Sequence, residues 1–86
     1  MFRIGFAPSA SKEFKRLPKA AKTSIAALLD GPFSQDPYSR ALPTKKLRTP
    51  FPGYRLRCGE YRILYTIEDT YIKVYSVRHR KDAYRQ

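Results

Sequence analysis

The segment from residue 53 to residue 65, GYRLRCGEYRILY, alternates apolar and cationic side chains on both sides of a Gly-Glu pair. A period of two is typical of a half-buried β-strand, and glycine tolerates the positive φ that a two-residue hairpin turn needs. A turn at Gly59-Glu60 places Arg57 beside Arg62, with Arg55 two positions along the strand. A loop one residue longer would move Arg62 to the other face. The segment therefore predicts a β-hairpin of defined register.

Strand parity separates the two faces of this hairpin. Arg55, Arg57 and Arg62 share one face, although like charges facing each other across strands destabilise a sheet. This convergence indicates an anion-binding surface, with RNA phosphate as the leading ligand; a solvated outer face of a basic protein is the alternative. The opposite face is suited to packing under helices and carries Tyr54, Leu56, Cys58, Tyr61, Ile63 and Tyr65.

Composition narrows the class of protein. The 86 residues suit a single domain, 1–86, and the formal net charge of +11 points to nucleic acid or an acidic protein partner. The single cysteine, Cys58, excludes an internal disulfide and alternates inward, as a small core residue would. We expect no metal and no cofactor, because no Cys/His cluster has ligand spacing. No apolar run has the length of a membrane span or signal peptide, so we expect a cytoplasmic protein.

The first third of the chain predicts a strand followed by two helices. Residues 2–6 alternate as a short strand, and residues 9–17 form a helix with Lys12, Glu13, Lys15 and Arg16 outside. A second helix begins at Pro18 and ends at residues 30–32. The five prolines from Pro32 to Pro52 indicate a loop over residues 33–52. The loop carries a basic cluster that either contacts phosphate or is simply solvated: Lys45, Lys46 and Arg48.

Three strands follow, at roughly 54–58, 60–67 and 70–77. If Glu68-Asp69 is a two-residue turn, Arg62 pairs with Tyr75 and Leu64 pairs with Lys73. The cationic face then extends to Lys73, Tyr71 and Tyr75. The predicted class is α+β, with a two-helix hairpin packed on one side of a mainly antiparallel four-stranded sheet whose other side is open and basic.

Three blocks resemble one family: FKRLP at 14–18, YRLR through EYRILY at 54–65, and SVRHRKDAYR at 76–85. With this spacing, the chain is similar to the RelE/ParE superfamily of small bacterial and archaeal toxins from type II toxin–antitoxin modules. The resemblance covers nearly the whole chain and implies the RelE-like microbial RNase fold. Its RelE branch comprises ribosome-dependent endoribonucleases that cut mRNA in the decoding A site, whereas its ParE branch targets DNA gyrase and typically lacks the cationic catalytic set.

The resemblance also implies site residues. The RelE catalytic set falls on Arg55, Arg57, Arg62, Arg80 and Tyr84, which favours a metal-independent endoribonuclease. By position Arg57 takes the place of the base, Arg62 holds the phosphate, Arg80 lies near the leaving oxygen, and Tyr84 stacks on a base or assists proton transfer. Further RNA contacts are expected from Lys45, Lys46, Arg48, Lys73, Arg78, His79 and Lys81.

Arginine stands at positions 55 and 57 where the familiar nuclease has lysine. Arginine stays protonated below about pH 12, so it is a poor general base. The proton then goes to water, to a ribosomal group or to another side chain, and Lys73, His79 and Tyr84 are the alternatives. His79 also has a structural interpretation, as a residue that fixes the tail.

Partners follow from the same resemblance. They are an acidic RelB-like antitoxin, the 70S ribosome with its mRNA and rRNA, and operator DNA only through the antitoxin complex; no membrane is involved. Two other functions stay open. One is a ParE-like gyrase inhibitor, and the other is a non-catalytic module that binds RNA or the ribosome.

Overall fold

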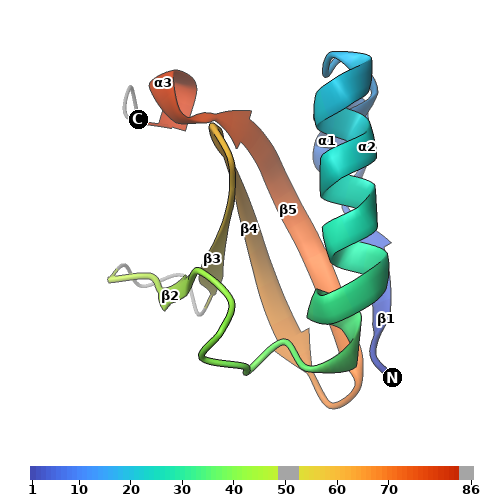
Figure 1. The fold of residues 1–86 in the computed structure, drawn as a ribbon, viewed down its shortest axis with the longest axis vertical. Coiled ribbons are helices and arrows are strands. Elements are labelled where there is room, and N and C mark those ends of the chain that lie inside the picture. The colour runs from blue at the N-terminus through green and yellow to red at the C-terminus, as the bar shows by residue number, and fades with distance from the viewer. Residues whose placement is uncertain (49–52, 84–86) are drawn as a thin grey trace.

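The computed structural model describes residues 1–48 and 53–83. Two helices lie side by side next to a mixed sheet whose strand order is β1-β5-β4-β3-β2 (Figure 1). β1 runs parallel to β5, and every other pair of neighbours is antiparallel. The predicted α+β class with a two-helix hairpin is confirmed. The elements are β1 (Arg3–Phe6), α1 (Pro8–Lys15), α2 (Lys19–Leu28), the π-helical turn η1 (Leu29–Phe33), β2 (Thr44–Lys46), β3 (Tyr54–Cys58), β4 (Tyr61–Glu68), β5 (Tyr71–His79) and α3 (Arg80–Ala83).

The predicted number of strands is wrong: over residues 1–48 and 53–83 the sheet has five strands, because β2 lies inside the segment interpreted as loop. Thr44 pairs with Leu56 and Lys46 with Tyr54 along the edge of β3. Pro43, which precedes β2, accepts a backbone hydrogen bond from Arg57 through its carbonyl at 3.0 Å. A strand of three residues is too short to show an alternation of apolar and polar side chains, so the sequence does not predict it. β2 forms because its backbone pairs with the edge of β3.

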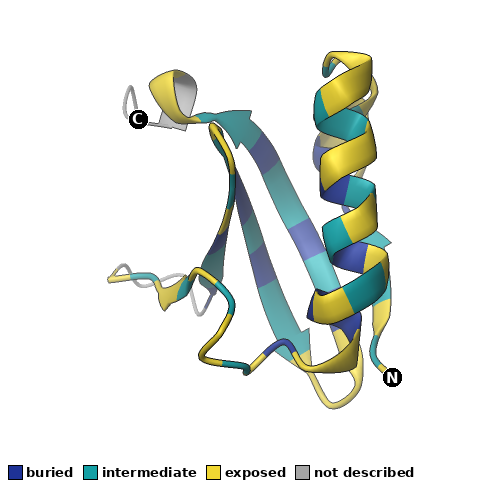
Figure 2. Cartoon of the chain, viewed as in Figure 1, coloured by how far each residue is buried: buried dark blue, intermediate teal, exposed yellow. Residues whose placement is uncertain are grey.

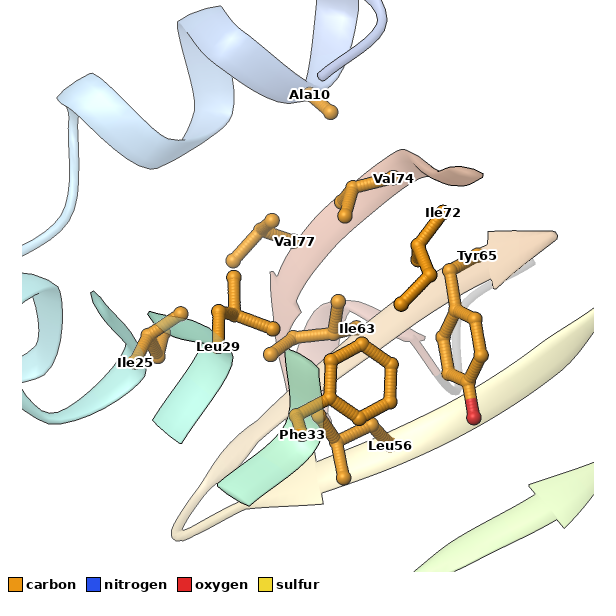
Figure 3. Packing of buried hydrophobic residues seen from close by; sticks show 10 residues of the cluster. All are labelled: Ala10, Ile25, Leu29, Phe33, Leu56, Ile63, Tyr65, Ile72, Val74 and Val77. Carbon is orange, nitrogen blue, oxygen red and sulfur yellow. The ribbon is translucent and has the colours of Figure 1, made fainter. Parts of the chain in front are cut away.

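A single cluster of apolar side chains joins the helices to one face of the sheet (Figure 3). Burial alternates along β4 and β5, while α2 carries its buried residues toward the sheet and is largely exposed elsewhere (Figure 2). η1 continues α2 and turns Phe33 into the core, where its ring meets Tyr65 edge-on at 4.9 Å between centroids. The buried members of this core cluster are Ala10, Ile25, Leu29, Phe33, Leu56, Ile63, Tyr65, Ile72, Val74 and Val77.

Among the described residues, no helix has the length and apolar character to cross a bilayer.

The predicted register of the first hairpin is confirmed. Cys58 pairs with Tyr61 and Arg57 with Arg62, and Gly59 takes the positive φ of 58° that the turn requires. An alanine at this position would be strained by its backbone alone.

The predicted register of the second hairpin is wrong. The turn lies one residue later, at Asp69-Thr70, where Asp69 has a φ of 52°. A β-bulge between Leu64 and Tyr65 then adds a further shift, so Arg62 pairs with Arg78 instead of Tyr75, and Leu64 with Ser76 instead of Lys73. A bulge places two residues opposite one, and no local sequence signal marks it here.

Glu13 of α1 is not an outward-facing charge, as its helical position predicts. β1 pairs with β5 only as far as Val74, so the next residues of β5 form an open edge. Glu13 satisfies this edge: its Oε1 accepts the Val77 N–H at 3.0 Å, and its Oε2 accepts the Arg78 Nε–H at 2.8 Å. One carboxylate therefore ties α1 to the strand that leads into α3.

Replacing Glu13 should therefore destabilise the fold. We expect Glu13→Ala to lower the free energy of unfolding by about 1–2 kcal/mol, because a backbone N–H and a guanidinium lose a shared charged acceptor. Urea denaturation followed by circular dichroism measures this change. Lys12→Ala, an exposed change on the same helix, should stay within about 0.5 kcal/mol of wild type. Equal losses of unfolding free energy in the two variants would show that Glu13 does not hold α1 to β5.

Candidate functional site

A row of arginines crosses the sheet from strand to strand. Arg57 on β3, Arg62 on β4 and Arg78 on β5 occupy directly paired positions. Arg62 is 8% exposed, and burying a guanidinium carries an effective penalty of several kcal/mol, on the order of that for any buried ion. Like charges at paired positions repel each other, so this row is a candidate site for binding negative charge.

The row opens into a pocket of about 320 Å³ at the tip of the first hairpin. Arg80 reaches this pocket from α3, which lies beside the hairpin tip (Figure 1). The Arg80 N–H donates to the Glu60 carbonyl at 2.7 Å, and Arg80 Nη1 lies 3.6 Å from Glu60 Oε2. We call this site the arginine pocket, and it is lined by Arg57, Gly59, Glu60, Arg62 and Arg80.

A second basic pocket, of about 260 Å³, lies where β2 meets β3. Lys45 pairs directly with Arg55, so the two cations share a face. Arg55 and Arg57 are two positions apart on β3, a separation of about 7 Å along a strand. The two pockets are thus consecutive along β3, and we call them together the cationic track. The second pocket is lined by Lys45, Lys46, Leu47, Arg48 and Arg55.

Lys73 lies away from the arginine pocket. It pairs with Thr66, four positions along β4 from Arg62, which is about 13 Å. Its Nζ lies 5.2 Å from the centroid of the Tyr75 ring, a cation–π arrangement. Lys73 shares the face of the arginines, but the structure does not bring it to them.

His79 and Arg78 both have intramolecular partners. His79 has the parity of Val77, which is on the helix-covered face, and its ring meets that of Tyr61 edge-on at 5.4 Å. Its Nδ1 accepts the Lys81 N–H at 3.2 Å, which fits the interpretation of His79 as a residue that fixes the tail. Arg78 is held by Glu13 at the open edge of β5. Lys81 is exposed on α3, and Tyr84 lies outside the described residues.

Glu60 is the site residue that the sequence analysis missed. It is the second residue of the predicted turn, where a polar side chain is ordinary, so its type gave no signal. The sequence does not predict that Arg80 of α3 contacts the hairpin tip, and this contact is what brings Glu60 into the site. Within the described ranges 1–48 and 53–83, no three His, Cys, Asp or Glu side chains gather as a metal site would require.

Cys58 lies on the face opposite the arginines, paired with Tyr61. Burial raises the pKa of the Cys58 thiol, which therefore stays protonated at neutral pH. A thiol in this state is a weak nucleophile, as expected of a core residue.

These features define a small basic α+β domain with an arginine-lined site at the tip of a hairpin. A family model described as the ParE toxin of the type II toxin-antitoxin system, parDE, matches residues 4–84. The chain therefore belongs to the RelE/ParE superfamily of type II toxins, as the resemblance predicted.

Individual relatives are toxins named RelG or RelE. Toxin RelG of Mycobacterium tuberculosis is 30% identical over 88 residues, which cover 99% of this chain and 98% of that protein. The toxin in the toxin–antitoxin complex RelBE2 of the same organism superimposes with a TM-score of 0.80 at 26% identity, over 91% of this chain and 96% of that one. The isolated E. coli RelE toxin shares the fold, with a TM-score of 0.75 at 21% identity, over 99% of this chain and 97% of that one.

The state of Cys58 can be tested by alkylation. Because the thiolate is the reacting form, a raised pKa should shift the pH profile of iodoacetamide alkylation upward in the folded protein. Mass spectrometry after short exposures, from pH 7 to 11, measures the midpoint. In guanidinium chloride the burial is lost, so the midpoint should fall. A folded midpoint at or below the denatured one would contradict a desolvated thiol.

Proposed function

We propose that this toxin is a ribosome-dependent endoribonuclease. It cleaves mRNA in the decoding A site by attack of a 2′-hydroxyl on the adjacent phosphodiester, and so inhibits translation. The observation that carries the proposal is the convergence of Arg57, Arg62 and Arg80 in one pocket from three separate elements.

The chemistry of RNA cleavage requires such a cluster. In the transition state the phosphorus has five oxygen neighbours and more negative charge than in the ground state. Preorganised cations stabilise this charge without having to rearrange during the reaction. Guanidinium groups suit the task, because each can grip two phosphate oxygens at once. In the proposed reaction Arg62, which is buried in the middle of the row, holds the phosphate, and Arg80, which also lines the pocket, acts near the leaving oxygen.

The partners of this activity follow from charge. The formal net charge of +11 favours an acidic antitoxin of the RelB kind, and the neighbour RelBE2 is itself a toxin–antitoxin complex. The 70S ribosome presents mRNA and rRNA to the cationic track, through contacts from Lys45, Lys46 and Arg48. Operator DNA is reached only through the antitoxin complex. The protein acts in the cytoplasm, where ribosomes are found.

A second candidate function is inhibition of DNA gyrase by protein binding. It is favoured by the matching family model, whose description names the ParE toxin. A gyrase inhibitor has no need to gather three guanidinium groups in a pocket, so this observation weighs against it. A non-catalytic binder of RNA or the ribosome would need the charge but not the chemistry.

Primer extension on mRNA tests the nuclease. With translating ribosomes, the wild type should produce discrete cuts within codons. We expect Arg57→Ala and Arg80→Ala each to lower the cleavage rate by about 100-fold or more, the usual effect of losing one transition-state donor. Both side chains are exposed, so the variants should fold, as circular dichroism will check. Arg16→Ala removes the same charge at the exposed end of α1 and should cleave like wild type.

Two results would redirect the proposal. If purified wild type makes no cuts with or without ribosomes, the nuclease is wrong, and a gyrase supercoiling assay decides for the second candidate. If wild type co-sediments with ribosomes but leaves mRNA intact, the protein is a non-catalytic binder. Equal activity in Arg57→Ala and wild type would show that cleavage does not use the arginine pocket.

A further inference from the structure

The arginine pocket holds charge well but lacks an obvious base. Attack by a 2′-hydroxyl requires a group that accepts its proton, and such a group contributes about 10²–10⁴-fold to the rate. Arg57 occupies the position of the base by family resemblance, but a guanidinium group is a poor general base. Lys73 and His79 lie outside the pocket. Among the described residues that line it, Glu60 alone carries a carboxylate, a type of side chain that can act as a general base.

The backbone places Glu60 firmly while leaving its carboxylate able to move. Glu60 is the second residue of the Gly59-Glu60 turn, and its carbonyl is held by the Arg80 N–H at 2.7 Å. Among the described residues its carboxylate makes one long ion pair, with Arg80 at 3.6 Å, and the Glu60 and Arg80 side chains are 62% and 55% exposed. An exposed pair of this kind contributes little to stability, so a phosphate can displace the carboxylate from Arg80.

Stability does not explain a carboxylate at this position. Its ion pair contributes little, whereas a negative charge next to bound phosphate weakens RNA binding by simple repulsion. A surface that only had to bind RNA would be improved by removing it. A surface that has to deprotonate a hydroxyl next to the phosphate needs it.

We propose that Glu60 is the general base of the cleavage reaction; this inference rests on the proposed function. A phosphate oxygen takes the place of Glu60 on Arg80, and the released carboxylate accepts the proton of the 2′-hydroxyl. The bond from the 2′-oxygen to phosphorus forms as the bond from phosphorus to the 5′-oxygen breaks, and the 5′-oxygen takes a proton from solvent water. The products are a 2′,3′-cyclic phosphate and a 5′-hydroxyl, and Glu60 returns its proton to solvent.

The test measures cleavage and binding separately. Single-turnover cleavage of ribosome-bound mRNA and co-sedimentation with ribosomes are compared for wild type, Glu60→Gln, Glu60→Asp and Glu68→Gln. Glu68→Gln is the matched control, since it makes the same change at an exposed residue of the other hairpin. We expect Glu60→Gln to slow cleavage by about 10²–10⁴-fold while ribosome binding is unchanged or tighter. Glu60→Asp should retain part of the rate, and the control all of it.

The pH profile gives a second readout that a structural role would not change. Wild type and Glu68→Gln should lose cleavage below the pKa of the base with a slope of one, and Glu60→Gln should lack this limb. Cleavage by Glu60→Gln at the wild-type rate overturns the assignment, as does a parallel loss of binding. If wild type cleaves, Arg57→Ala does not and Glu60→Gln cleaves at the full rate, the endoribonuclease function stands and only the role of Glu60 is wrong. If wild type never cleaves, both the proposed function and the role of Glu60 are wrong.

Discussion

The register of the β3–β4 hairpin is the constraint on which the site depends. It places Arg57 and Arg62 side by side, and the bulge in the next hairpin adds Arg78 to the row. A shift of one residue would send Arg62 into the core face and break the row. The two-residue turn with Gly59 in the left-handed region excludes that shift, so a single glycine fixes where the cations lie. The geometry of the site is thus set by backbone pairing rather than by contacts among the arginines, which repel each other.

Two carboxylates, those of Glu13 and Glu60, lie near this row of arginines, and their different surroundings suit them to different roles. Glu13 accepts two short hydrogen bonds at the open edge of β5, from the Val77 N–H and the Arg78 Nε–H. It completes the sheet edge and holds Arg78 back from the pocket. Among the described residues, Glu60 makes one long, exposed ion pair, with Arg80 in the arginine pocket. A partner held so weakly can change with the arrival of substrate, whereas Glu13 cannot leave without exposing a backbone donor.

Sequence reasoning succeeded where one local rule decides the outcome and failed where distant segments decide it. Alternation around Gly59-Glu60 predicted the first hairpin and the shared face of Arg55, Arg57 and Arg62. It missed β2, because an edge strand of three residues depends on the edge that β3 offers. It misplaced Lys73, because the turn at Asp69-Thr70 and the bulge beyond it shift the register without a local mark. It treated Glu13 as a solvated charge and passed over Glu60, since both owe their roles to residues met only in the fold.

The arginine-only cluster bears on which branch of the superfamily the chain represents. A lysine crowded by cations can lose its proton and serve as a base, but an arginine cannot. With arginine at 55, 57 and 62, the cluster can hold a phosphate without being able to activate a hydroxyl. A nuclease built on this cluster must therefore take its base from outside the arginine set. The hairpin tip is the one part of the described pocket that supplies a carboxylate, through Glu60. A toxin that only binds its target gains nothing from that charge, so what Glu60 does separates a catalyst from a binder.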